Sequence, residues 1–244
     1  MQNQLFFLFL IVIVSFLYAS VGHGGASGYL ALMVLFGINQ SEMKTSALIL
    51  NVFVSAIAFI SYYREGYFRS KILIPFIILS IPLAFIGAHI TIDTRTYKLL
   101  LAACLLIATM RILGFIQKKN SEQRITLRFI PAMLIGGVIG LISGILGIGG
   151  GVILSPVLLL LHWANMKETA ALSAAFIFLN SIAGLAGATL SDFIISPTLY
   201  FWSGAAIIGG MAGAYFGSKR FNPTALKYVL SVVMVFAIFK LIIS

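Results

Sequence analysis

The sequence contains few charged residues and a single cysteine. Only 9% of its 244 residues are charged and 61% are hydrophobic, whereas soluble domains are about a quarter charged. With Cys104 alone, neither a disulfide within the chain nor a cysteine-based metal cluster can form. The runs between charged positions are long enough to cross a hydrocarbon core of about 30 Å. The composition therefore predicts an all-α polytopic membrane protein without a separate soluble domain.

Acidic residues are scarce as well, and the six that occur lie at the boundaries of the apolar runs. No combination of His, Asp and Glu has the spacing of metal ligands, and no carboxylate lies inside a run for acid–base chemistry. We therefore expect no enzyme activity, no metal and no cofactor. The net charge of +10 comes from Lys and Arg at the ends of apolar segments. This placement indicates orientation in a membrane rather than nucleic-acid binding.

The charge-free runs occur twice in the same order. The main runs are 41, 19, 21 and 12 residues long in the first half and 38, 23, 26 and 12 in the second. The sequence Gly22-His23-Gly24-Gly25 corresponds to Gly147-Ile148-Gly149-Gly150 at an offset of 125. Such internal duplication is common in transporter folds. We expect a first repeat (1–117), a basic linker (118–128) and a second repeat (129–244) within one membrane domain.

The first run of each half is too long for one membrane-spanning helix. About 40 residues would extend roughly 60 Å, twice the hydrocarbon thickness. The glycines mark where the chain turns back, so each run is predicted to form a glycine-broken helical hairpin. The expected helices cover about 5–20 and 27–39 in the first half, and about 130–146 and 152–164 in the second. Ser155-Pro156 resembles an N-cap with a first-turn proline, which would delay the start of the last of these helices.

Two topologies follow from these runs. If each first run is a hairpin, each half has about five segments and the halves are inverted, with Lys and Arg divided twelve to four between the two sides. If each first run crosses once, the halves are parallel repeats of four segments, eight helices in total, and the division is nine to seven. Because basic residues concentrate in the cytoplasm, we favour inverted repeats with both termini outside and the linker inside.

The two glycine runs are the predicted binding site. Non-helical backbone is tolerated in a membrane only where it is buried in protein or lines a cavity, and matching breaks in two repeats mark transporter sites. Exposed N–H groups before a helix N-terminus suit a small anion near the membrane midplane. The alternative is that the glycines only allow close helix packing. The backbone candidates are Gly22, Gly24, Gly25, Gly147, Gly149, Gly150 and Gly151.

Polar side chains near the two runs complete the predicted site. His23 is expected either to bind a substrate oxygen or a proton, or merely to cap loop carbonyls. Asn51 and Asn180 hold comparable places in the two halves, where each either binds substrate or hydrogen-bonds a neighbouring helix. Because Ile148 corresponds to His23, the predicted site is asymmetric. The side-chain candidates are His23, Ser27, Thr45, Ser46, Asn51, Ser173 and Asn180.

The second glycine run also resembles a known family. Gly147-Ile148-Gly149-Gly150-Gly151 is followed by Pro156-Val157-Leu158, and the next helix opens with Ala-Leu-Ser at 171–173. This duplicated pattern resembles the TauE/SafE sulfite exporters, also called 4-toluene sulfonate uptake permeases, over essentially the whole chain. In the first half, Ala26 replaces the last glycine and Ala31 stands where Pro156 would be.

The resemblance implies a secondary transporter of a small sulfur-containing anion, sulfite or an organosulfonate, in the bacterial inner membrane. The family is commonly described as having eight helices. The alternative function is a permease for a neutral or cationic solute, which is disfavoured for a cation because no buried carboxylate is present to balance it. The expected partners are a small anionic substrate and the lipid bilayer.

Overall fold

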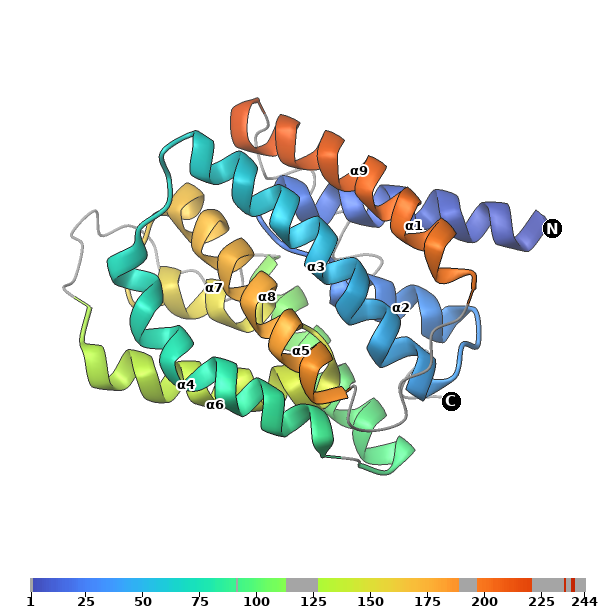
Figure 1. The fold of residues 1–244 in the computed structure, drawn as a ribbon, viewed down its shortest axis with the longest axis horizontal. Coiled ribbons are helices and arrows are strands. Elements are labelled where there is room, and N and C mark those ends of the chain that lie inside the picture. The colour runs from blue at the N-terminus through green and yellow to red at the C-terminus, as the bar shows by residue number, and fades with distance from the viewer. Residues whose placement is uncertain are drawn as a thin grey trace.

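The structure, a computed structural model, describes residues 2–90, 92–112, 127–188, 197–220, 235, 238 and 239. All regular structure in these residues is helical, as predicted (Figure 1). Most of the predicted linker and of the last apolar segment lies outside the described residues. The first half forms α1 (Gln2–Ser20), α2 (Ala26–Leu35), α3 (Gln40–Arg64), α4 (Ser70–His89) and α5 (Thr94–Ile112). The second half forms α6 (Phe129–Leu146), α7 (Gly151–Leu160), α8 (Met166–Ala188) and α9 (Leu199–Lys219).

Helix lengths divide the described part of the chain into spanning and short elements. Five helices are long and apolar enough to cross a membrane, namely α3 from Glu42, α4, α6, α8 and α9. The helices that follow the glycine runs, α2 and α7, have ten residues each. Ten residues extend about 15 Å, half of the hydrocarbon thickness, so neither short helix can cross a bilayer alone.

Both short helices end earlier than predicted, and for the same reason. After α2, the N–H of Ile38 bonds to Met33 O and the N–H of Gly37 to Val34 O, with Gly37 at φ 74°. After α7, Trp163 and His162 bond in the same way to Leu158 and Leu159, with His162 at φ 54°. This is the Schellman ending, in which a left-handed residue closes the helix. The two endings are 125 residues apart, the same offset as the glycine runs.

The centre of the bundle is the pair α3 and α8, which lie side by side and run in opposite directions (Figure 1). Leu48 lies against Gly184, Asn51 bonds to Ser181, and Tyr62 clusters with Ala170. The residue number falls along α8 as it rises along α3. The corresponding helices of the two halves therefore pack antiparallel.

The first helix of each half packs along the fourth helix of the other half, α1 with α9 and α6 with α4. Glycines four residues apart bring the backbones together, since a Cβ at any of them would overlap the facing backbone. Both glycine rows lie in the second half of the chain. The pairs are Gly136 with Phe76, Gly140 with Ser80, Gly144 with Ala84, Gly209 with Val12, Gly213 with Phe16 and Gly217 with Ser20.

Charged residues join the halves at one end of the bundle. Arg69, just before α4, donates from Nε to Glu168 Oε1 at 3.2 Å. Glu168 also forms a capping box with Asn165, in which each side chain accepts the backbone N–H of the other at 3.1 and 2.9 Å. Nearby, Lys219 lies 3.8 Å from Glu65. The end of α3, the start of α8 and the end of α9 thus share one end of the bundle.

Candidate functional site

Each glycine run forms a tight connection between two helices. We call Gly22–Gly25 the first tip and Gly147–Gly150 the second tip. The first and last glycines of both tips are left-handed, with φ of 75° and 98° in the first and 72° and 74° in the second. Helix α2 begins directly after the first tip and α7 directly after the second, and neither has a side-chain N-cap hydrogen bond. First-turn N–H groups lack partners inside a helix and form its positive end.

The two tips meet at one side chain, Asn51 of α3, which is fully buried. Its Oδ1 accepts the N–H of Ala26, the first residue of α2, at 3.1 Å. Its Nδ2 donates to the carbonyl oxygen of Ile148 in the second tip at 3.4 Å and to Ser181 Oγ on α8 at 3.1 Å. One carboxamide therefore bridges the first tip, the second tip and the central helix pair.

Close contact with Asn51 explains why each tip has a glycine at its third position. A Cβ at Gly24 or at Gly149 would overlap the Asn51 carboxamide, and either would lie 2.9 Å from Ile177 Cγ2. At Gly149 the backbone adds a second requirement, because its φ of 71° is left-handed. Both glycines thus bring backbone close to the polar centre, as expected where main-chain groups are to contact a ligand.

His23 links the first tip to the second half. Its Nδ1 lies 3.0 Å from Val21 O, and its Nε2 lies 3.0 Å from Ser155 Oγ on α7. Ser155 Oγ lies in turn 2.6 Å from Ser173 Oγ on α8. The ring is partly buried, whereas both serines are almost fully buried. The result is a polar chain from the first tip to α8, beside the start of α7.

The family profile described as "Sulfite exporter TauE/SafE" matches residues 7–241, almost the whole chain. The chain belongs to this family. It is 35% identical over 234 residues to "Probable membrane transporter protein y4hK" of Sinorhizobium fredii (strain NBRC 101917 / NGR234), covering 94% of each protein. It is 27% identical over 224 residues to "Probable membrane transporter protein YdhB" of Bacillus subtilis (strain 168), covering 87% of this chain and 90% of that protein. No solved structure matches significantly.

In this TauE/SafE transporter, the structure brings only some of the predicted side chains together. His23, Asn51 and Ser173 belong to the contacts at the tips. Ser27 instead bonds to Tyr18 O–H at 2.7 Å, which fastens α2 to α1. Asn180 donates to Phe176 O of its own helix at 2.9 Å, and its Oδ1 has no partner among the described residues.

Thr45 and Ser46 are buried on α3, and the Ser46 hydroxyl has no partner in the part of the chain that the structure describes. In the described part of the chain, neither side chain hydrogen-bonds to a tip. Their inclusion in a site therefore stays a prediction.

Sequence reasoning missed three serines near the tips. Ser155 was predicted to be an N-cap, but α7 begins at Gly151, and Ser155 lies inside the helix with its Oγ 2.9 Å from Gly151 O. That prediction was wrong because Gly150 already supplies the left-handed start. Ser181 follows Asn180 and accepts a hydrogen bond from Asn51. No pattern in the second half of the sequence indicates this bond to the first half. Ser143 lies beside Gly150, and its buried hydroxyl has no partner among the described residues.

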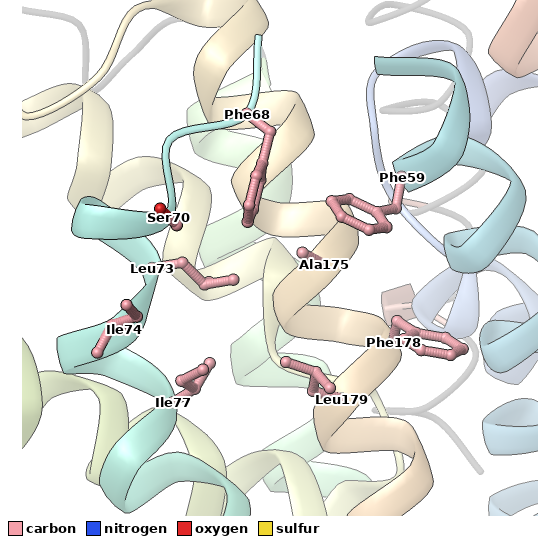
Figure 2. A pocket seen from close by; sticks show the side chains of 9 residues that line it. All are labelled: Phe59, Phe68, Ser70, Leu73, Ile74, Ile77, Ala175, Phe178 and Leu179. Carbon is pink, nitrogen blue, oxygen red and sulfur yellow. The ribbon is translucent and has the colours of Figure 1, made fainter. Parts of the chain in front are cut away.

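A cavity of about 300 Å³ lies away from the tips, between α3, α4 and α8 (Figure 2). Its lining is apolar except for Ser70 at the start of α4. Because none of its lining side chains is charged and all but Ser70 are apolar, the cavity does not favour a small anion. The lining residues are Phe59, Phe68, Ser70, Leu73, Ile74, Ile77, Ala175, Phe178 and Leu179.

Proposed function

We propose that this TauE/SafE membrane transporter carries a small sulfur-containing oxyanion, sulfite or an organosulfonate, as a secondary transporter. The anion is held by backbone N–H groups and by the N-termini of α2 and α7 at the two tips. The observation that carries the proposal is the convergence of both tips on Asn51, whose carbonyl oxygen already accepts the N–H of Ala26. A substrate oxygen would use the same donor, because helix N-termini favour negative groups.

Side chains around the tips support the same function. The hydroxyl of Ser143, buried and without a partner among the described residues, lies beside Gly150 as a further donor. His23 and Ser173 add polar groups beside the start of α7, where both lie within hydrogen-bond distance of Ser155. We include Ser27, Thr45, Ser46 and Asn180 as residues that would contact substrate in another conformation of the carrier, since all four are buried.

We propose that residues 1–117 and 129–244 are inverted repeats, each opening with a glycine-broken hairpin and joined by the linker 118–128. The antiparallel packing of α3 and α8 supports inversion, since equivalent helices of parallel repeats point the same way. The contacts of Glu65 with Lys219 and of Arg69 with Glu168 also favour it. The eight-helix parallel arrangement would put residues 64–71 on the opposite side of the membrane from 167–168 and 219–227.

The same contacts bear on location in the cell. We propose the bacterial inner membrane, with both termini outside and the basic clusters in the cytoplasm. Members of three clusters, Arg69, Lys167 and Lys219, make contacts at one end of the bundle, where Lys167 donates to Ser218 O at 3.2 Å. A single basic end is what the positive-inside rule expects.

The test is thermal unfolding of the purified protein with sulfite, sulfate, thiosulfate, small sulfonates, carboxylates, and neutral or cationic solutes. A ligand at about 100 times its Kd stabilises the native state by about 2.7 kcal/mol. We expect selective protection by sulfur oxyanions. Protection by a neutral or cationic solute alone would contradict the proposal and favour the view that the tip glycines serve packing only.

A substitution at the bridging residue sharpens this test. In Asn51→Asp, one carboxylate oxygen still accepts the Ala26 N–H, while its charge repels an anion and the donor to Ile148 and Ser181 is lost. We expect the oxyanion affinity derived from the protection, and the transport of the oxyanion into proteoliposomes, to fall at least about tenfold, as for a lost 1.4 kcal/mol. The matched control is Asn39→Asp at the exposed start of α3, which makes no side-chain cap bond. Equal protection of both variants by the oxyanion would contradict the proposed site.

A further inference from the structure

The contacts of His23 determine where one of its protons sits. Nδ1 lies 3.0 Å from the carbonyl oxygen of Val21. A carbonyl oxygen only accepts hydrogen bonds, so Nδ1 carries a hydrogen in both the neutral and the charged ring. Any change of charge on His23 therefore takes place at Nε2, the nitrogen that faces Ser155.

Ser155 has three hydrogen-bonding neighbours but only one hydrogen. Its Oγ lies 3.0 Å from His23 Nε2, 2.9 Å from Gly151 O and 2.6 Å from Ser173 Oγ. When Nε2 carries no hydrogen, Ser155 donates to it and accepts from Ser173. When Nε2 is protonated, Ser155 accepts from it and donates to Gly151 O, still accepting from Ser173.

Both charge states of the ring thus fit the same positions of the heavy atoms. They differ in one added proton and in the rotation of one hydroxyl. In the charged state, each of the contacts named above has one donor and one acceptor. A site that gains and loses a proton without repacking its neighbours is suited to carrying that proton through a transport cycle.

We propose that His23 is a proton-binding site and that the transporter carries one proton together with each anion; this rests on the oxyanion function proposed above. The proton comes from water, forms the N–H bond at Nε2, and leaves to water on the other side when the anion leaves. The charged ring lies beside the positive N-terminus of α7, where an unpaired positive charge is unfavourable. An anion at the tips offsets this unfavourable charge. The proton and the anion therefore each strengthen binding of the other.

The other ionisable groups near the two tips are tyrosines and one lysine, Lys44 of α3, whose Nζ donates to Ala88 O at 2.9 Å and whose side chain lies against Gly147 of the second tip. The hydroxyls of Tyr18, Tyr29 and Tyr62 are hydrogen-bonded and stay neutral at ordinary pH. The remaining charged groups on the elements packed against the tip lie toward the helix ends, with Glu42 and Arg64 in the first and last turns of α3, and α7 contains no titratable residue. At the ends of α8 and α9, Glu168 is paired with Arg69, Lys167 bonds to Tyr67 and Ser218, and Lys219 is paired with Glu65.

Only one of the two tips carries this site. Ile148 stands in the second tip where His23 stands in the first, and it is 3% exposed within the apolar core. The expected stoichiometry is therefore one proton per chain and per anion.

The experiment is isothermal titration calorimetry of the purified transporter with methanesulfonate and with sulfate, whose own charges are constant over the range used. Titrations in two buffers with different ionisation enthalpies, from about pH 6 to about pH 8, count the protons taken up per anion. For the unaltered protein we expect uptake approaching one proton on the alkaline side. On the alkaline side, the affinity for the anion should fall by up to about tenfold for each unit rise in pH, because one proton binds together with each anion.

Variants assign the proton to its residue. His23→Gln should bind anion more weakly, without proton uptake and without the pH dependence. The matched control, His89→Gln, alters an exposed histidine at the end of α4 and should behave like the unaltered protein. Ser155→Ala keeps the imidazole but removes the acceptor for Nε2–H. We expect it to shift the pH midpoint of anion binding down by about one unit, the difference between a charged and a neutral hydrogen bond.

The outcomes separate this proposal from the proposed function. Anion binding without proton uptake, or uptake that persists in His23→Gln, would overturn the proton site and leave the oxyanion carrier standing. Failure of sulfite, sulfate and sulfonates to bind at any pH would overturn both. If His23→Gln does not fold, an unshifted pH midpoint in Ser155→Ala would overturn the proton site.

Discussion

The two tips share left-handed glycines at their first and last positions but differ at the positions between them. Gly22 and Gly25 correspond to Gly147 and Gly150, and all four have left-handed φ. Between them the first tip carries His23, bonded to Ser155 on α7, whereas the second carries Ile148 in the apolar core. The left-handed glycines that begin and end the turn are thus present in both halves, whereas the residue at the second position differs and the third glycine is left-handed only in the second tip. In the proposed mechanism, the two tips together hold one anion and only the first tip binds a proton.

The largest effect is expected from adding a methyl group at the third position of a tip. Gly149→Ala combines overlap with Asn51 and a left-handed φ, so we expect a loss of about 3 kcal/mol or more in unfolding free energy. Gly24→Ala has only the overlap, worth about 1–3 kcal/mol. Denaturant unfolding in detergent measures both losses.

The control for this pair is Gly37→Ala, which has the same left-handed strain at φ 74° but open space around its Cβ. Gly37→Ala should lower the free energy of unfolding by about 1–2 kcal/mol, which is the effect of the left-handed backbone alone. A Gly149→Ala variant no less stable than Gly37→Ala would show that the close contact at Asn51 contributes nothing.

The next effect comes from making the second tip resemble the first. Ile148→His would bury an imidazole without a hydroxyl partner, which should cost about 1–3 kcal/mol. Leu30 corresponds to Ser155 at the offset of 125, and it is fully buried. The double variant Ile148→His with Leu30→Ser should therefore be more stable than the sum of the single changes predicts, in the same unfolding assay. Strict additivity would contradict the equivalence of the two tips.

The smallest effect compares the starts of α3 and α8. Asn165 and Glu168 form a capping box with an ion pair to Arg69, whereas Asn39, 126 residues earlier, makes no side-chain cap bond. We expect Glu168→Gln to lower the free energy of unfolding by about 1–2 kcal/mol, because it weakens a charged hydrogen bond. Glu42→Gln, the corresponding change on α3, should stay within about 0.5 kcal/mol. Equal losses would mean that the Arg69 contact is not stabilising.

The sequence located much of the candidate site without showing how its parts meet. His23, Asn51 and Ser173 were found because polar residues are rare in apolar runs, where each is costly unless it has a partner. Ser155 was misassigned to a helix start, because a Ser-Pro pair indicates an N-cap unless a preceding glycine already begins the helix. Asn180 held a symmetric position but bonds to its own helix, since the second tip reaches Asn51 instead.

The sequence by itself determined the membrane class, the family and the position of both glycine tips, and it predicted the duplication. These properties depend on local composition and on short motifs, because apolar length and glycine content act within a few residues of where they occur. Only the tertiary structure decided that both tips converge on Asn51 and that His23 reaches Ser155. Those bonds join residues 97 and 132 positions apart, and they exist because the antiparallel packing of α3 and α8 brings the two halves together.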